Sequence, residues 1–234
     1  MSDTVTFESK EILAIAAATK TVQLLKDAIT HSGHASWVLA GGSTPMLAYE
    51  YIAAYHLEDL DWSKVTLLLG DERCGPLDSP DNNWHAIDDA LLRHIPQSTR
   101  IRPVTDIDPA TAATDYEAAV RSYLDTAPSK QFSVVWLGMG PDGHTLSLFP
   151  DHASMNATTK LVIPVYESRK PPADRMSFTL EVLQYAYSTI ILSAGSDKRD
   201  AYAQALQSDS KLPIAQAAKQ TNATWFVTRD IINV

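Results

Sequence analysis

The sequence predicts an α/β fold in which an open, mainly parallel sheet is covered by helices on both faces, in the doubly wound, Rossmann-like arrangement. Short apolar runs alternate with segments of helical periodicity, the order of elements in a parallel sheet. Of the 234 residues, 45% are hydrophobic and 20% are charged, the usage of a globular chain. A chain of this length buries a sizeable core without disulfides or metal.

The first half of the chain supplies helices and strands in alternation. Apolar residues recur at helical spacing over 9–32, and Gly33 stands where a helix ends. The run 36–40 then predicts a strand that is closed by a glycine-rich turn. The elements expected after it are helix 46–55, strand 65–69, helix 84–94, helix 110–125 and strand 132–137.

The second half continues the pattern without a composition shift that would indicate a linker, so one domain over 1–234 is expected. Its expected elements are strands 161–166, 176–180, 189–193 and 224–227, with a helix over 198–206 and a surface loop at Pro171-Pro172. Ligands of open parallel sheets bind beyond the carboxyl ends of the strands. The segments after Ala40, Leu69, Leu137 and Ser193 are therefore expected to form one cleft.

The charge and the cysteine content indicate which kinds of binding partner and which cellular compartment are expected. The chain has 19 Lys and Arg against 28 Asp and Glu, a formal net charge of −9, which argues against a nucleic-acid partner. The single Cys74 excludes an internal disulfide and fits a reducing compartment. Neither an export signal nor an apolar run long enough to span a membrane is found, so a cytoplasmic protein is expected.

Two segments at strand ends carry candidate binding groups. In Gly41-Gly42-Ser43-Thr44-Pro45, Ser or Thr before a proline suits a helix start whose free N–H groups attract an anion, although an ordinary capped turn fits as well. Asp71-Glu72-Arg73, with Asn83 downstream, follows the strand that ends at Leu69. Charged residues at the end of a strand indicate a binding or catalytic site. The alternative is a solvated turn that contains its own ion pair.

The most informative segment is 138–150, GMGPDGHTLSLFP. Its start satisfies the dinucleotide pattern G-x-G-x-x-G, but Pro150 stops a helix begun at His144 too early and Asp142 would repel a pyrophosphate. We therefore interpret Asp142 and His144 as an oriented imidazole base, with a structural loop as the alternative.

Basic residues further on are candidates for binding an anion. Arg175 begins an expected strand and Lys198 follows Gly195, and either could equally be a solvated surface charge. The sequence contains no G-x-S-x-G elbow, no H-E-x-x-H and no P-loop, and its other histidines lack metal-ligand spacing, so no metal is expected.

Together, these motifs resemble the 6-phosphogluconolactonases of the glucosamine-6-phosphate isomerase/6-phosphogluconolactonase superfamily, from about residue 10 to the end of the chain. The resemblance implies hydrolysis of 6-phospho-D-glucono-1,5-lactone to 6-phosphogluconate in the pentose phosphate pathway, with no metal or organic cofactor. The roles it implies are His144 as base, Asp142 as its orienting group, Arg73 at the oxyanion or the leaving oxygen, Asp71 orienting Arg73 or sugar hydroxyls, and Gly41, Gly42, Ser43, Thr44, Asn83, Arg175 and Lys198 in substrate binding.

Two alternatives stay open. Glucosamine-6-phosphate deaminases share the glycine-rich turn and the Asp-Gly-His, but they carry a glutamate where this chain has Phe149. A noncatalytic sugar-phosphate sensor is expected to have a helix-turn-helix and a basic face, and neither is visible here.

Leu146 departs from the smaller Ala that is common in the lactonases, which affects pocket volume. A monomer and a dimer are both consistent with the sequence.

Overall fold

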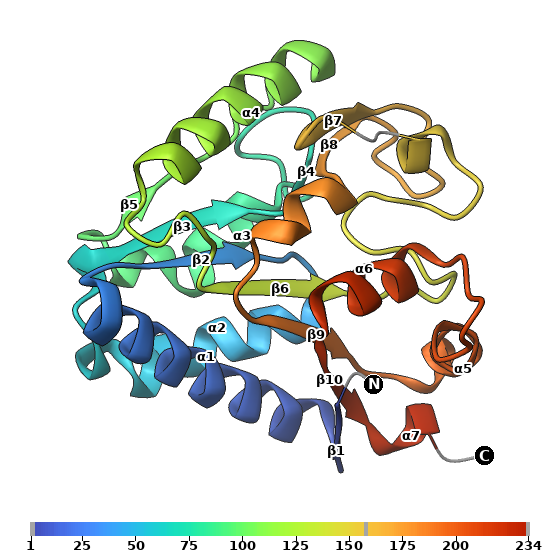
Figure 1. Cartoon of the computed structure of the whole chain (residues 1–234), viewed down its shortest axis with the longest axis horizontal. Helices are drawn as coiled ribbons and strands as arrows, with labels where there is room; N and C mark the ends of the chain where they lie inside the picture. The colour runs from blue at the N-terminus through green and yellow to red at the C-terminus, as the bar shows by residue number, and fades with distance from the viewer. Residues whose placement is uncertain (1–2, 157–158, 233–234) are drawn as a thin grey trace.

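The computed structural model describes residues 3–156 and 159–232, and it confirms the predicted fold class. The main sheet contains β1 (Thr4–Phe7), β2 (Ala35–Leu39), β3 (Val65–Leu69), β5 (Thr99–Arg100), β6 (Val134–Gly138), β9 (Thr189–Ser193) and β10 (Thr224–Thr228). The strands run in the order β1-β10-β9-β6-β2-β3-β5, and all of the pairs are parallel (Figure 1). The order reverses between β6 and β2, where a ligand site is expected.

Helices cover both faces of this sheet (Figure 1). One face carries α1 (Lys10–Ser32), α2 (Ser43–Tyr55) and α3 (Asn83–Ala90), and the other carries α4 (Pro109–Thr126), α5 (Arg199–Ala205), α6 (Pro213–Thr221) and α7 (Arg229–Ile232). Successive residues of β2 alternate between the two cores: Trp37 packs with α1 and α2, and Val38 packs with α4. This alternation follows from the two-residue period of a strand and explains why β2 is apolar throughout.

A second, antiparallel sheet was not predicted. It consists of β4 (Asp71–Arg73), β8 (Arg175–Phe178) and β7 (Val162–Val165), so the strands expected at 161–166 and 176–180 exist but lie outside the main sheet. The chain changes sheets at Gly70, whose N–H donates to Leu39 in the main sheet and whose carbonyl accepts from Phe178. This crossing brings the Asp71-Glu72-Arg73 segment beside β8.

Several boundaries differ from the sequence prediction. The helix expected over 84–94 ends at Ala90 and is followed by a 3₁₀ turn, Leu92–His94, while the helix expected over 198–206 begins with a 3₁₀ turn, Ser196–Lys198. The strands β1 and β5 and the helix α6 were missed. The remaining short 3₁₀ segments are Leu57–Asp59, Trp62–Lys64, Ala153–Asn156 and Leu180–Tyr185. Within the described ranges, no helix is both long and apolar enough to cross a bilayer.

Candidate active site

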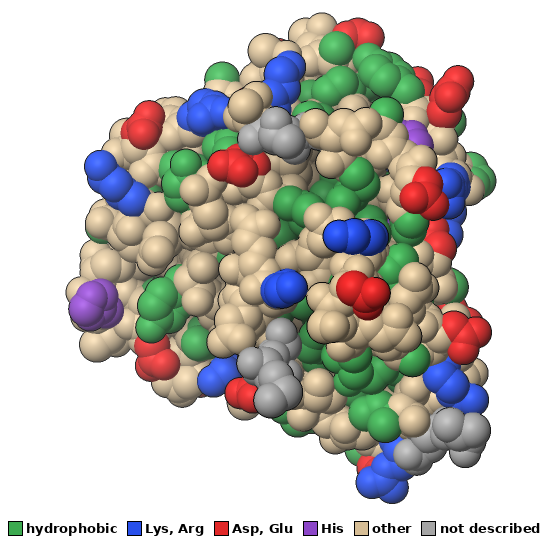
Figure 2. Space-filling model, turned by 45° about the vertical axis from the view of Figure 1, so that its right-hand side comes forward, with side chains coloured by type: hydrophobic (Ala, Val, Ile, Leu, Met, Phe, Trp, Pro, Cys, Tyr) green, Lys and Arg blue, Asp and Glu red, His purple; other side chains and the backbone are tan. Residues whose placement is uncertain are grey.

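A cavity of about 350 Å³ opens at the carboxyl ends of the central strands, where the order of the strands reverses. Segments that follow β2, β3, β6 and β9 all line it, so the predicted convergence is confirmed. Lys and Arg side chains lie near the middle of this side of the molecule (Figure 2). The predicted site residues that line the cavity are Gly41, Gly42, Ser43, Thr44, Asp71, Arg73, Asn83, His144, Arg175 and Lys198, while Asp142 lies behind His144.

The glycine-rich turn delivers the amino terminus of α2 to the cavity. The helix begins at Ser43, with Gly42 as its N-cap at φ +105° and no side-chain cap bond. This differs from the expected cap by Ser or Thr. It places Pro45 third in the helix, where its missing N–H costs nothing, and leaves the N–H groups of Ser43 and Thr44 uncapped at the positive end of the helix dipole. This arrangement suits an anion.

His144 and Asp142 form a hydrogen-bonded pair on the loop after β6. Asp142 Oδ1 contacts His144 Nδ1 and also accepts from the backbone N–H of His144. A carboxylate only accepts, so Nδ1 carries the proton and Nε2 is left as the basic nitrogen. The ring of Phe149 packs against the imidazole, with 4.7 Å between ring centroids. The imidazole is thus fixed in both tautomer and orientation.

Burial sets the protonation state of this pair. Desolvation lowers the pKa of His144 from its ordinary value, with Asp142 acting in the opposite direction and the nearby Lys170 ammonium adding to the decrease. Burial raises the pKa of Asp142, but hydrogen bonding from His144 outweighs it, so the net shift is downward. The pair is consequently an ionised carboxylate beside a neutral imidazole at neutral pH, the protonation state that a general base requires.

Asp71, which follows the end of β3, is held in place by hydrogen bonds to buried groups. Asp71 Oδ2 accepts a 2.6 Å hydrogen bond from Ser147 Oγ, and the Asp71 carbonyl accepts from Asn83 Nδ2 at 3.0 Å. No ion pair joins Asp71 to Arg73 within residues 3–156 and 159–232. A Cβ on Gly41 would lie 2.1 Å from Asn83 Oδ1, which accounts for glycine at that position.

Glu72, to which the sequence analysis gave no role of its own, positions the neighbouring segment. Its buried carboxylate accepts from the backbone N–H groups of Arg73, Asn83 and Trp84 at 2.7–2.8 Å and so joins β4 to the start of α3. Desolvation raises the pKa of Glu72 to about 7, although the three hydrogen bonds act in the opposite direction. Arg73 Nη1 donates to the carbonyl of Asp81 at 2.6 Å, while its buried Nε has no partner among the residues described.

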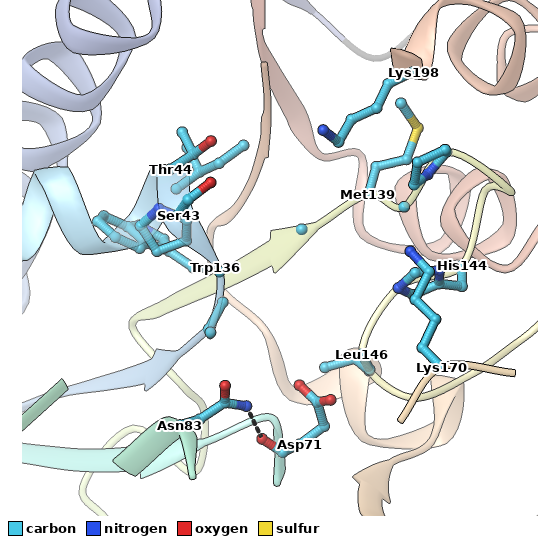
Figure 3. A pocket seen from close by; sticks show the side chains of 18 of the residues that line it. Ser43, Thr44, Asp71, Asn83, Trp136, Met139, His144, Leu146, Lys170 and Lys198 are labelled. Atoms are coloured by element: carbon cyan, nitrogen blue, oxygen red, sulfur yellow. Dashed lines mark hydrogen bonds between the residues drawn. The ribbon is translucent and has the colours of Figure 1, made fainter. Parts of the chain in front are cut away.

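The basic residues around the cavity differ in how their donors are used. Arg175 is only 4% exposed and makes four hydrogen bonds, three of them to backbone carbonyls of the loop before β8. Lys198 Nζ donates to the carbonyl of Ala194 at 2.8 Å and faces Ser43 and Thr44 across the cavity (Figure 3). The expected phosphate ligands Ser43 and Lys198 therefore share one cavity.

The sequence analysis missed one lysine that lines the cavity and another that contacts a cavity residue. Lys170 lines the cavity beside His144 (Figure 3), and Lys10 Nζ donates to Ser43 Oγ at 2.7 Å. Neither has a local sequence signal, since Lys170 lies in a proline-containing loop and Lys10 at the first turn of α1. Among the described side chains, no group of three or more His, Cys, Asp or Glu is arranged to hold a metal ion.

Comparison with known proteins identifies the family. The sequence model of the family described as glucosamine-6-phosphate isomerases/6-phosphogluconolactonase matches residues 8–226. The chain belongs to this family. Within it, a 6-phosphogluconolactonase of Streptomyces coelicolor is 35% identical over 97% of this chain and 93% of its own length. That of Mycobacterium tuberculosis is 33% identical over 96% and 94%.

Solved structures of family members agree with the architecture. The 6-phosphogluconolactonase of Thermotoga maritima has a TM-score of 0.85 at 27% identity and covers 98% of this chain and 100% of its own. The enzyme from Leishmania guyanensis has a TM-score of 0.87 at 26% identity and covers 99% of this chain and 97% of its own. The likeness extends over the whole α/β fold, including the segments that line the cavity.

Proposed function

We propose that this chain hydrolyses 6-phospho-D-glucono-1,5-lactone to 6-phosphogluconate in the pentose phosphate pathway. The observation that carries the proposal is the joint presence, in one cavity, of an oriented neutral imidazole and an uncapped helix amino terminus. The imidazole can act as a general base for water, and the helix amino terminus is a binding site for a phosphate dianion. The 6-phosphogluconolactonases among its relatives support the same activity.

The proposed reaction uses His144 Nε2 to take a proton from water as the water oxygen bonds to C1 of the lactone. The carbonyl electron pair moves onto oxygen, giving a tetrahedral oxyanion. As this intermediate collapses, the bond between C1 and the ring oxygen breaks, and the ring oxygen takes the proton back from His144. Asp142 stays ionised and stabilises the imidazolium between the two proton transfers. General base catalysis of this kind contributes roughly 10²–10⁴-fold.

The remaining groups have proposed roles in binding. The N–H groups of Ser43 and Thr44, with Lys198, hold the phosphate. Arg73 lines the cavity, and its guanidinium is the donor for the oxyanion or the leaving ring oxygen. Asp71 bonds to Ser147 and not to Arg73 in the described part of the chain, which favours orientation of sugar hydroxyls as its role.

Arg175, Gly41, Gly42 and Asn83 shape the substrate-binding cavity. Because three Arg175 donors bond to loop carbonyls, it has one Nη1–H left beyond the bond to Ser147 for a ligand. Leu146 lines the cavity near Asp71, as expected for a residue that affects pocket volume (Figure 3).

The deaminase alternative requires a second acid–base group near His144. Position 149, where the deaminases carry glutamate, holds a fully buried phenylalanine that packs on the imidazole and lies under the Arg175 guanidinium. Its ring transfers no proton, so amine release lacks a partner for His144. This position favours hydrolysis of a lactone, which needs one base and one water.

The proposal is tested by an assay with freshly prepared phosphogluconolactone, coupled to 6-phosphogluconate dehydrogenase and corrected for spontaneous hydrolysis. The expected result is acceleration by the wild-type chain and a loss of kcat of roughly 10²–10⁴-fold in His144→Ala, with the phosphate site intact. Release of ammonia from glucosamine 6-phosphate would instead favour the deaminase. Wild-type turnover in His144→Ala would show that another group is the base.

Other expectations remain predictions: the absence of a metal or organic cofactor and of a nucleic-acid partner, a cytoplasmic location, and a single domain over 1–234.

A further inference from the structure

Arg175 fixes a loop rather than pointing freely into the cavity. Its Nε donates to the carbonyl of Pro172 at 3.1 Å, and its Nη2 donates to the carbonyls of Lys170 at 2.9 Å and Pro171 at 3.3 Å. Three consecutive carbonyls therefore converge on one buried guanidinium. Ser168 Oγ also donates to the Lys170 carbonyl at 2.6 Å and accepts from the Lys170 N–H at 3.3 Å.

The same bonds anchor the backbone of Lys170. Both backbone groups of Lys170 are hydrogen-bonded, although the residue itself is exposed. Its side chain extends beside the imidazole of His144 and lines the cavity (Figure 3). Within the ranges described, no carboxylate lies within ion-pair distance of its Nζ. The loop thus holds an unpaired ammonium next to the proposed base.

We infer that Lys170 is a further catalytic residue, which donates a hydrogen bond to the oxyanion that forms on the lactone carbonyl, and that Arg175 is its positioning residue. This inference rests on the proposed function. The water activated by His144 attacks C1, so a donor beside His144 is beside the carbonyl that acquires charge. No proton leaves Lys170: the ammonium stabilises the oxyanion while the carbonyl pair resides on oxygen, and it is unchanged when C1 expels the ring oxygen.

A phosphate contact is the competing role for this ammonium, and the placement disfavours it. The amino terminus of α2 and Lys198 flank another part of the cavity from that occupied by Lys170 and His144 (Figure 3). The two roles differ in kinetics. Stabilisation of charge that exists only in the transition state changes kcat, whereas a grip on a remote phosphate is uniform binding and changes KM.

The test compares Lys170→Met with Lys170→Arg and with Arg169→Met, which removes a neighbouring charge that does not line the cavity. We expect Lys170→Met to lower kcat about 10²-fold with KM changed less than about threefold, Lys170→Arg to recover part of the rate, and Arg169→Met to match wild type. Arg175→Lys should also lower kcat, because one ammonium cannot bond to three carbonyls, and the double variant Lys170→Met/Arg175→Lys should be little worse than Lys170→Met alone.

A pH profile gives a second readout. The charged groups that face His144 are Lys170, Asp142 and Asp71. Removal of the Lys170 ammonium should shift the acidic limb of kcat/KM to higher pH, because that charge lowers the pKa of His144, while Lys170→Arg should leave the limb in place.

Several results would overturn the inference. Wild-type kcat in Lys170→Met would do so, as would a KM raised tenfold or more together with weaker inhibition by inorganic phosphate, the pattern of a phosphate ligand. Thermal melting of each variant separates these outcomes from misfolding. Absence of lactonase activity in the wild-type chain would refute the proposed function itself, and this is distinguishable because it appears before any variant is compared.

Discussion

Gly140→Ala should disable the site without removing any polar group. A Cβ on Gly140 would lie 2.0 Å from Cε1 and 2.1 Å from Nδ1 of His144, and 2.7 Å from Asp142 Oδ1. Ordinary contact begins at 3.4 Å, so the imidazole must move from 2.0 to 3.4 Å, about 1.4 Å. The ring cannot make this move while it keeps both Asp142 and the packing of Phe149.

A displacement of this size has a predictable kinetic cost. Misplacement of a reacting group by about 1 Å costs roughly 10²-fold in rate, so kcat of Gly140→Ala should fall by about that factor or more. The coupled lactonase assay measures it, and thermal melting reports whether the fold persists. The matched control is the same change in a His144→Ala background, where the imidazole is gone and Gly140→Ala should add little. Wild-type kcat in the single variant would refute the geometry on which the base assignment rests.

Three further predictions concern stability, pH and binding. Glu72→Ala leaves three backbone N–H groups without their acceptor and should lower the free energy of unfolding by at least about 2 kcal/mol in urea denaturation; an unchanged midpoint would contradict the role given to this carboxylate. Because burial lowers the pKa of His144, kcat/KM should be constant at neutral pH and fall on acidification with a midpoint below about 6.5, and a midpoint above that value would exclude it as the base. Lys10→Met should raise KM severalfold with kcat retained, since Lys10 orients Ser43 Oγ at the phosphate seat, and a change confined to kcat would argue otherwise.

The central strands of the main sheet could be predicted because they are short, mainly apolar runs buried on both faces, whereas the edge strands β1 and β5 are largely exposed and were missed. Val65–Leu69 and Thr189–Ser193 have the predicted boundaries, since every residue of both strands is buried. β4 could not be predicted, because its three polar residues, Asp71–Arg73, form a strand only through pairing with β8, which lies about a hundred residues away. Helix α6 was missed although it starts at a proline and buries Ile214, Ala217 and Ala218 at helical spacing.

The candidate site could be predicted where reactive side chains and glycines occur in one short segment, as in 138–150. Glycine at 140 and histidine at 144 form a local unit whose geometry the spacing determines. Lys170 has no such unit: it is brought to the cavity by Arg175, whose bonds to the loop carbonyls follow from tertiary packing. These bonds leave Arg175 one Nη1–H for a ligand, so its expected part in substrate binding stays a prediction.

The central claim is that one cavity holds a phosphate at the start of α2 and presents the reacting carbon to His144. A crystal structure of the chain with bound 6-phosphogluconate tests this most directly. It should show the phosphate within hydrogen-bonding distance of the Ser43 and Thr44 N–H groups, and the C1 carboxylate of the product next to His144 Nε2. A phosphate bound elsewhere, or a C1 carboxylate on the far side of the cavity from the imidazole, would contradict it.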